Sequence, residues 1–502
     1  MLCCHCKKNQ ATKTYEKFTD GKKQTEYYCL DCYHRLFISI DVEPSPPKAR
    51  GRQIAMCPYC GTSEEDFRAR GLVGCAQCYQ SLAPTVIPVV IRLQGNEIHC
   101  GKKPKNSGDR EETVRRRNLL KNRVEEFIKD KNFEAAKICS EELKRLNNFC
   151  TGRKAMIEAD SAAFIETTVT STRVRLARNL FGFPFPDKLN PAQAKEVVRM
   201  VGYELNHLDE FTEYDIGKIG AEEATLLQEK HLISPDLIRR KEVSAAFISS
   251  DKDVSVMVNE EDHLREQYIL KGYDLYKAYE RISGIDDGIA RSVSFAYDEK
   301  LGYLTACPSN LGTGMRASVM MFLPGLAKYK KLEELLPSLK VNGLTVRGVF
   351  GEGTAAEGYS YQISNERTLG YSEADILSHM DEVTLNLAEL EIRARERMLE
   401  EDETGYRDMC LRAYGALTNC ALLPVKELTA GMVKVKLGVA LGFFRAPDMV
   451  RLNDFIANMR PVSFKMGNCP DAKDERTCDL LRAKIVRKIL PDLVRRADEA
   501  GE

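Results

Sequence analysis

The sequence predicts a multidomain α+β protein that begins with small cysteine-rich modules and ends in a helical region. Three observations lead to this prediction. Four C-x-x-C pairs fall in the first 100 residues, strand-like alternation recurs between 169 and 347, and helical periodicity dominates after residue 372. A length of 502 residues leaves room for roughly three to five domains. We expect them at 1–45, 53–100, 111–150, 156–400 and 401–502.

Charge and hydropathy restrict the class of protein. The chain carries 74 Lys and Arg against 74 Asp and Glu, so its net charge is zero, which argues against nucleic acid as a direct ligand. No apolar run approaches the ~18 residues that cross a bilayer. The first residues, MLCCHCKKNQ, lack the apolar core of a secretory signal. We therefore expect a cytoplasmic protein without membrane contact.

The C-x-x-C pairs define two candidate metal sites, which form the modules at 1–45 and 53–100. Two pairs separated by 14 residues have the usual spacing of a four-thiolate zinc site, and the other set has an insert of 22 residues. Structural disulfides conflict with a reducing cytosol, and a redox motif would need only one pair. We predict two structural Zn²⁺ sites, with no role assigned to Cys4, His5, His99 or Cys100. The predicted ligands are Cys3, Cys6, Cys29, Cys32, Cys57, Cys60, Cys75 and Cys78.

A polar linker at 101–110 leads into two short runs of helical periodicity between 111 and 150. The phrase KNFEAA at 131–136 resembles the UVR motif of excision-repair subunits and Clp-associated adaptors, and an ordinary helical hairpin is the alternative. Together with the cysteine pattern, it makes residues 1 to about 150 resemble the McsA-type bacterial adaptors. That resemblance implies a segment that binds and activates a kinase.

Four phrases between 171 and 354 carry an unusual set of arginines and glutamates. They are STRVRLARN at 171–179, NEEDHLR at 259–265, CPSNLGTGMRAS at 307–318 and RGVFGEGT at 347–354. The P-loop and the protein-kinase HRD and DFG motifs are missing. The two-residue period of a strand places Arg173 and Arg175 on one face. As a set, the phrases resemble the phosphagen (guanidino) kinases, and most nearly their McsB-type protein arginine kinase branch.

This resemblance implies a large antiparallel sheet flanked by helices, with ATP and Mg²⁺ bound to it. It implies that the ATP phosphates are bound by Arg173, Arg175, Arg265, Arg316 and Arg347. It also implies that Glu261 and Glu352 bind the guanidinium group of the substrate, and that Cys307 and Asn310 lie close to that group. The chemistry agrees, because arginine forks grip phosphate and a carboxylate can accept a proton from the guanidinium. We predict Glu261 as the principal base and Glu352 as its partner. A surface network of ion pairs is the alternative interpretation.

The substrate prediction depends on a missing segment. Small-guanidine kinases have a helical domain of about a hundred residues that closes over the substrate. Only a short stretch separates residue 156 from the first arginine phrase, so a protein-bound arginine is favoured over free arginine. A small-molecule arginine kinase and a non-catalytic zinc scaffold remain the alternatives.

The C-terminal region offers a second candidate site. The phrase RDMCLRA at 407–413 resembles the phosphoarginine pocket of McsB-type kinases, which would use Arg407, Asp408 and Arg412, and a helix-surface ion pair is the alternative. Helices around 447–459 and 475–497 could provide homodimer contacts. The resemblance further implies a stress-response role, with a heat-shock repressor and the Clp degradation machinery as partners.

Overall fold

The computed structural model describes residues 13–19, 22–28, 55–104, 159–348, 358–472 and 474–499, together with Leu2, Cys4, Cys6 and Lys7. The chain divides into two compact units, Met1–Ile54 and Ala55–Glu502. In the first unit, β1 (Lys13–Thr19) pairs antiparallel with β2 (Lys22–Tyr28). The hairpin predicted at 111–150 lies outside the described residues, and so do Cys3, Cys29, Cys32 and Glu352. Within the described ranges, no helix is long and apolar enough to cross a membrane.

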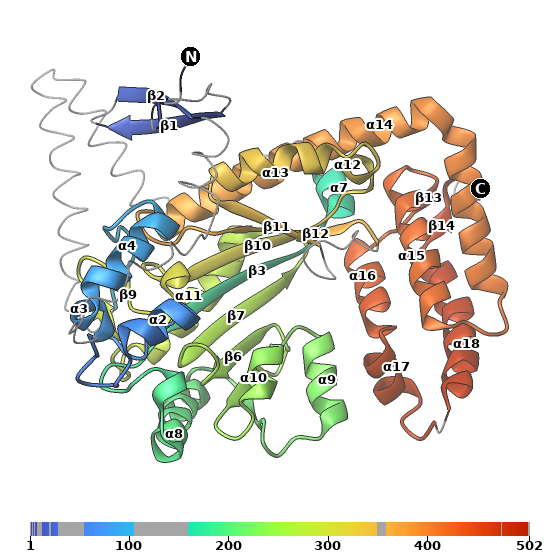
Figure 1. The fold of residues 1–502 in the computed structure, drawn as a ribbon. Helices are drawn as coiled ribbons and strands as arrows, with labels where there is room; N and C mark the ends of the chain where they lie inside the picture. Colours follow the sequence, from blue (N-terminus) through green and yellow to red (C-terminus); the bar gives the residue numbers. More distant parts are fainter. Residues whose placement is uncertain are drawn as a thin grey trace, which may run out of the picture. The chain divides into compact units, whose positions relative to one another are not determined.

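An eight-stranded, fully antiparallel sheet forms the centre of the second unit (Figure 1). This architecture confirms the predicted α+β class. The strand order is β11-β12-β10-β3-β7-β6-β5-β4. In chain order the strands are β3 (Val169–Arg178), β4 (Phe211–Asp215), β5 (Ala245–Ser249), β6 (Val254–Val258), β7 (Leu264–Lys271), β10 (Met315–Phe322), β11 (Leu344–Gly348) and β12 (Ser360–Asn365). A small hairpin of β8 (Tyr297–Asp298) and β9 (Gly302–Tyr303) precedes β10.

The two faces of the sheet have different coverings. Side chains of alternate residues, such as Val174, Val256 and Val319, point into the main hydrophobic core, where helices pack over them. At one end of the opposite face, a smaller cluster packs around Leu237 and Met257. The helices of this domain are α7 (Ala159–Thr168), α8 (Pro191–Leu208), α9 (Ala221–Glu229), α10 (Pro235–Arg239), α11 (Leu275–Ile289), α12 (Pro324–Lys328) and α13 (Lys331–Val341).

A small helical module precedes the sheet domain and packs against it. It contains α2 (Glu64–Arg70), α3 (Cys78–Ser81) and α4 (Ala83–Gln94). Ser63 begins α2 with a reciprocal capping box, in which its hydroxyl accepts from Asp66 N and the Asp66 carboxylate accepts from Ser63 N. One hydrophobic cluster joins Phe67 and Leu82 of the module to Phe185 and Leu311 of the sheet domain. We call residues 55–104 the finger, for the cysteine cluster described below.

The C-terminal region is helical, as predicted, and builds its own core (Figure 1). The long helix α14 (Glu373–Asn419) runs from the sheet domain into this region and is kinked at Asp402, whose φ and ψ are −162° and 65°. The helices α15 (Val425–Ala440), α16 (Met449–Asn458), α17 (Pro461–Asn468) and α18 (Glu475–Leu493) follow, with a short pairing of β13 (Phe444–Arg445) and β14 (Arg495–Arg496).

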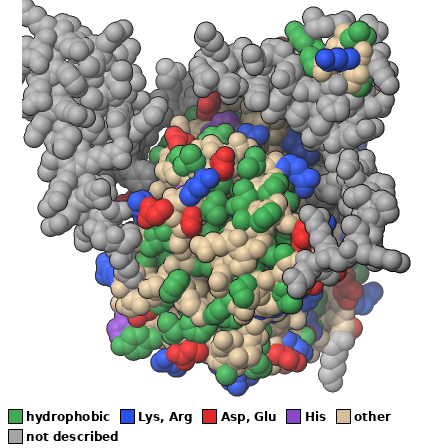
Figure 2. All heavy atoms as spheres, turned by 60° about the vertical axis from the view of Figure 1, so that its left-hand side comes forward, with side chains coloured by type: hydrophobic (Ala, Val, Ile, Leu, Met, Phe, Trp, Pro, Cys, Tyr) green, Lys and Arg blue, Asp and Glu red, His purple; other side chains and the backbone are tan. Residues whose placement is uncertain are grey.

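The surface of the chain on the side brought forward in Figure 2 mixes hydrophobic and uncharged side chains, with Lys and Arg interspersed among Asp and Glu. Among the described residues on this face, Lys and Arg form no continuous stripe.

Candidate active site

One face of the sheet carries all five arginines that the sequence predicts to bind phosphate. Residues directly opposite each other on paired strands share a face, and so do residues two apart on one strand. Arg175 lies opposite Arg316 on β10 and opposite Gln267 on β7, and Gln267 is two residues from Arg265. The same register continues through β12 to Arg347 on the edge strand β11. The five are Arg173, Arg175, Arg265, Arg316 and Arg347.

Neutral side chains accept hydrogen bonds from two of these arginines, and such bonds do not neutralise the charge of a guanidinium group. Arg173 Nη2 donates to Gln362 Oε1 at 3.1 Å, and Arg316 Nη2 donates to Ser364 Oγ at 3.1 Å. Arg175 Nε is buried and has no hydrogen-bond partner among the described residues. Guanidinium groups in this state are suited to a polyanion, which the phosphates of ATP would supply.

The arginines also depress one another's pKa. Burial and the charges of Arg265 and Arg316 lower the pKa of Arg173 to about 10. Burial and the charge of Arg347 lower the pKa of Arg316 to about 10. Burial and the charge of Arg173 hold the pKa of Arg175 well below its ordinary value. Keeping these cations together without an anion costs free energy, which a bound triphosphate would relieve.

A buried glutamate fixes the position of Arg265. Arg265 Nη1 lies 2.6 and 2.7 Å from the two carboxylate oxygens of Glu260, whose side chain is buried. Ser234 donates a further hydrogen bond to the same carboxylate. The guanidinium of Arg265 is thus held from one side while it remains half-buried on the site face.

Glu261 lies in a tight loop between β6 and β7. Asn259 opens the loop with a left-handed φ of 61°, and its N–H donates to the carbonyl of His263 at 2.9 Å. Burial and the charge of Glu260 raise the pKa of Glu261. Asn310 Nδ2 donates to Glu261 Oε1 at 3.1 Å, which orients the carboxylate. A positioned carboxylate with a raised pKa is a suitable proton acceptor.

Asp262 and His263 hold this loop in place. Asp262 Oδ1 accepts hydrogen bonds of 2.6 Å from Asn179 Nδ2 and from Ala306 N. His263 Nδ1 accepts from Leu180 N at 3.1 Å. Burial raises the pKa of Asp262 to about 7 and lowers the pKa of His263 to about 3. Both side chains are buried, so they support the loop that presents Glu261.

Cys307 shares a short loop with Asn310, next to Glu261. Its Sγ lies 3.0 Å from Ser309 Oγ. Burial and the charge of Glu261 raise the pKa of the Cys307 thiol. In this state the thiol is protonated at neutral pH, which does not favour a nucleophilic role.

The finger holds the loop that carries Cys307. Tyr79 OH donates to Thr305 O at 2.8 Å, where the loop begins. Gln94 Nε2 donates to Pro308 O at 3.0 Å and to Ser309 O at 2.9 Å. The side chains of Gln94 and Tyr79 are buried, with exposed fractions of 1% and 3%. Two helices of the finger therefore fix the backbone of the loop that supplies the hydrogen bond to Glu261.

The second predicted cysteine set is assembled in the finger. The sulfur atoms of Cys57, Cys60, Cys75 and Cys78 all lie within 4.8 Å of one another. Three of the Sγ–Sγ distances are 3.4, 3.6 and 3.8 Å. A tetrahedron with Zn–S bonds of about 2.3 Å has sulfur–sulfur edges of about 3.8 Å, so the four thiols fit Zn²⁺.

The first cysteine set lies only partly within the described residues. Cys4 Sγ accepts a hydrogen bond of 3.4 Å from Tyr27 N, and Cys4 N donates to Tyr27 O at 2.7 Å. These bonds bring Cys4 beside Tyr27, which comes two residues before Cys29 in the sequence.

The candidate phosphoarginine pocket lies on α14 beyond its kink. Arg407 pairs with Glu403 at 2.8 Å, and Arg412 pairs with Asp408 at 2.6 Å, all four side chains being exposed. The guanidinium carbon of Arg407 also lies 5.0 Å from the centre of the Phe443 ring. Both ion pairs are of the ordinary i,i+4 type on a helix surface.

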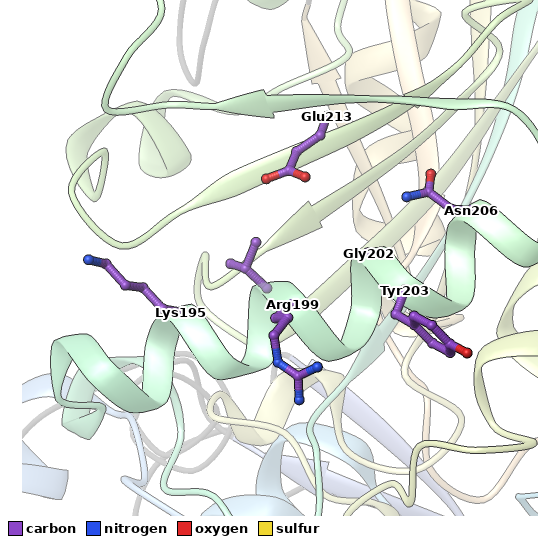
Figure 3. Close-up of a pocket in the computed structure, with 7 residues that line it drawn as sticks. Lys195, Arg199, Gly202, Tyr203, Asn206 and Glu213 are labelled. Carbon is purple, nitrogen blue, oxygen red and sulfur yellow. The ribbon is translucent and has the colours of Figure 1, made fainter.

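An open groove of about 380 Å³ lies elsewhere, between α8 and β4 (Figure 3). Lys195 and Tyr203 extend from the helix, and Glu213 extends from the strand. None of the residues that we predict to act on ATP or arginine lines it.

Several residues of the site escaped the sequence analysis. Glu260, Gln362 and Ser364 hold three of the arginines, and Gln94 and Tyr79 reach the Cys307 loop from the finger. A signal existed for two of them, because Gln362 and Ser364 alternate on a strand. Nothing in the sequence marked the two finger residues.

Comparisons with known protein families identify three parts of the chain. Residues 193–394 match the model of the ATP:guanido phosphotransferase C-terminal catalytic domain. Residues 55–101 match the McsA central zinc-finger domain, and residues 403–500 match the protein-arginine kinase McsB C-terminal domain.

Individual relatives agree with these matches. The protein-arginine kinase of Halalkalibacterium halodurans is 39% identical over 325 residues, which cover 63% of this chain and 91% of that protein. The protein-arginine kinase of Caldanaerobacter subterraneus subsp. tengcongensis is 40% identical over 329 residues, or 64% of this chain and 97% of that protein.

A solved structure supports the fold. The duplicated taurocyamine kinase from Schistosoma mansoni, with bound transition state analog components, superposes with a TM-score of 0.50 at 22% identity, covering 70% of this chain and 45% of that one. The likeness concerns the fold alone. On the relatives and the family models together, the chain belongs to the protein-arginine kinases, a family of ATP-using guanidino phosphotransferases, and carries in addition a zinc-finger domain of the McsA type.

Proposed function

We propose that this protein transfers the γ-phosphoryl group of ATP to arginine side chains of proteins. The observation that supports the proposal most directly is the set of five arginines on one sheet face, with Glu261 beside Arg265 at the end of neighbouring strands. Fixed positive charge and alignment are the main requirements of phosphoryl transfer, and this face supplies both.

The chemistry assigns a step to each group. Arg173, Arg175, Arg265, Arg316 and Arg347 would hold the phosphates, and Mg²⁺ bound with the nucleotide would supply further positive charge. A guanidinium nitrogen of the substrate attacks the γ-phosphorus, the bond from phosphorus to the bridging oxygen breaks, and ADP leaves. The nitrogen gives its proton to Glu261, with Glu352 as the proposed second clamp on the guanidinium.

Protein-bound arginine is the proposed acceptor. The two relatives described above are protein-arginine kinases, and they match over nearly their whole length. The finger contacts the Cys307 loop through Gln94, so we propose that it activates the kinase domain of the same chain. A second Zn²⁺ site formed by Cys3, Cys6, Cys29 and Cys32, and a UVR-like hairpin at 111–150, would complete this adaptor segment.

The wider role follows the family resemblance. We propose that Arg407, Asp408 and Arg412 contact phosphoarginine on modified proteins, which requires the two observed ion pairs to open. A stress-response role, with a heat-shock repressor as substrate and Clp machinery as the reader of the mark, completes the proposal.

The first test is the choice of acceptor. The purified chain is incubated with ATP and Mg²⁺ and either denatured casein or free L-arginine, and phosphoarginine is detected by mass spectrometry. We expect modified casein. Phosphorylation of free arginine alone would instead identify a small-molecule arginine kinase.

The second test concerns Glu261. We expect Glu261→Gln to lower kcat by about 10²–10⁴-fold, the usual contribution of a general base, with zinc content unchanged. Glu213→Gln is the matched control, because Glu213 is exposed in the groove between α8 and β4. Full activity of Glu261→Gln would refute the assignment of the base.

A further inference from the structure

The segment that follows the finger helices buries a lysine in the sheet domain. Lys102 Nζ lies 2.5 Å from Asp286 Oδ2, 3.2 Å from Asp287 Oδ1 and 3.0 Å from Ser283 Oγ. An ammonium group has three hydrogens to donate, so three acceptors from one helix, α11, satisfy it completely. The Lys102 side chain is only 14% exposed. Burial opposes its charge, but the Asp286 carboxylate outweighs that effect and raises the pKa of Lys102 above its ordinary value.

The backbone around Lys102 is fitted to the same place. Lys102 N donates to the buried carboxylate of Glu373 at 3.0 and 3.2 Å, at the start of α14. His99 Nε2 lies 3.1 Å from Lys102 O, within the segment itself. A Cβ added at Gly101 would come within 2.7 Å of Thr313 Cγ2 and 2.9 Å of Glu373 Oε1. The backbone of residues 99–102 is therefore held in one position against the sheet domain.

The carboxylate that receives Lys102 also supports a strand of the active site. Asp286 accepts from Arg178 Nε at 2.8 Å and from Arg178 Nη2 at 3.2 Å. Arg178 is fully buried on β3, and its guanidinium stacks over the Tyr303 ring at 3.6 Å. It lies three residues after Arg175, so the two side chains leave opposite faces of the strand. Asp286 thus pairs with two cations at once, Lys102 of the finger and Arg178 on the side of β3 opposite the phosphate-binding face.

We propose that Ser283, Asp286 and Asp287 form a lysine-binding socket, and that Lys102 is the anchor that keeps the finger docked on the kinase domain. Loss of the ammonium group would leave the buried carboxylate of Asp286 and the partly buried carboxylate of Asp287 with one cation fewer, which is unfavourable. The finger would then keep its hydrophobic cluster, the hydrogen bonds of Tyr79 and Gln94 and the backbone bond from Lys102 N to Glu373, but would lose the buried ion pair at its C-terminal end. The ligand class of the socket is the ammonium group of a lysine in an extended segment.

The neighbouring residue provides a matched control. Lys103 pairs with Glu299 at 2.9 Å, but the two side chains are 42% and 73% exposed, so this is an ordinary surface ion pair. In the full chain, we expect Lys102→Met to speed amide hydrogen exchange in residues 95–104 and in α11 by about tenfold or more. It should also lower Tm and slow phosphoarginine formation, with zinc content unchanged. Lys103→Met should match the unaltered protein in all four measurements.

A double variant tests whether the socket acts through charge. Asp287→Asn removes one of the two carboxylates, so adding it to Lys102→Met should recover part of the lost protection and Tm. Adding Glu299→Gln to Lys102→Met should recover nothing. Equal exchange in Lys102→Met and Lys103→Met, or no recovery in the Asp287→Asn double variant, would overturn the proposal.

The proposal does not depend on the substrate of the enzyme. Exchange and Tm report docking whether or not a protein is phosphorylated. A chain that fails the casein test but gives the expected exchange pattern would refute the proposed function and leave the anchor in place. If Lys102→Met does not fold, the double variant Lys102→Met with Asp287→Asn tests the proposal. If the socket acts through charge, removing one of its carboxylates should restore folding, and a double variant that also fails to fold would overturn the proposal.

Discussion

Arg175 illustrates the conflict between stability and function at the level of one residue. Its Nε is buried without a partner among the described residues, and three other guanidinium groups repel its charge. We expect Arg175→Met to lower phosphoryl transfer by about 10²–10³-fold, the usual cost of one lost charge-stabilising group. The same change should raise Tm in the absence of nucleotide, because it removes an uncompensated buried charge. Calorimetry with and without ATP measures both effects.

The control for this prediction is Arg347→Met. Arg347 is exposed on the edge strand β11, so its loss should weaken nucleotide binding without raising Tm. A lower Tm for nucleotide-free Arg175→Met would show that the arginine stabilises the fold.

His263 makes the stability of the fold sensitive to acid. Burial lowers its folded-state pKa to about 3, whereas the unfolded imidazole titrates near 6.5. The unfolded state therefore binds more protons between these values, and stability is lost as pH falls below about 6.5. From pH 7 to pH 5, we expect the free energy of unfolding to fall by about 2 kcal/mol relative to His263→Gln.

Denaturant titrations of both proteins at the two pH values supply the measurement. Taking the difference between them cancels the opposite effect of Asp262, whose raised pKa favours the folded state as pH falls. A constant difference across the pH range would contradict the assignment of a neutral, buried imidazole.

Residue chemistry explains which parts of the site the sequence could predict. The family resemblance singled out Arg173, Arg175 and Glu261, and the two-residue period of a strand correctly placed the two arginines on one face. Amides and hydroxyls have many roles. Gln94 meets Pro308 across more than 200 residues of chain, and only tertiary packing brings them together.

At the level of elements, α4 connects the cysteine cluster to the catalytic loop. Gln94, its last residue, donates to two loop carbonyls and accepts from Thr368 N at 2.8 Å. We expect Gln94→Ala to lower kcat by about tenfold or more with little change in the KM for ATP, because the loop orients Glu261 and does not belong to the arginine face. Steady-state kinetics and zinc content are the measurements.

Arg92→Ala provides the comparison on the same helix, since Arg92 is exposed. It should leave kcat unchanged. If Gln94→Ala raised the KM for ATP and spared kcat, the finger would act on nucleotide binding and not on the catalytic loop.

At the level of the whole molecule, local sequence signals predicted a zinc module and a helical C-terminal region but not how the parts pack. The cysteine spacing predicted a zinc module, and helical periodicity predicted the C-terminal region, since both signals are local. The shared hydrophobic cluster of finger and sheet domain combines ordinary apolar residues of both, such as Leu82 and Leu311, which no local pattern pairs. Long-range packing of this kind is set by the complete fold.

This shared cluster predicts how Ala55–Glu502 responds to zinc removal. Four thiolates so close together need a cation, so a chelator should unfold the finger and expose the apolar surface beneath it, including Phe185 and Leu369. We expect a lower Tm for the sheet domain as well, together with loss of kinase activity, and recovery of both on adding Zn²⁺. Calorimetry before and after chelation makes the test. If the thermal unfolding transition of the sheet domain were unchanged after complete loss of zinc, the finger and the sheet domain would fold independently. Unfolding the finger would then leave the stability of the sheet domain unaltered.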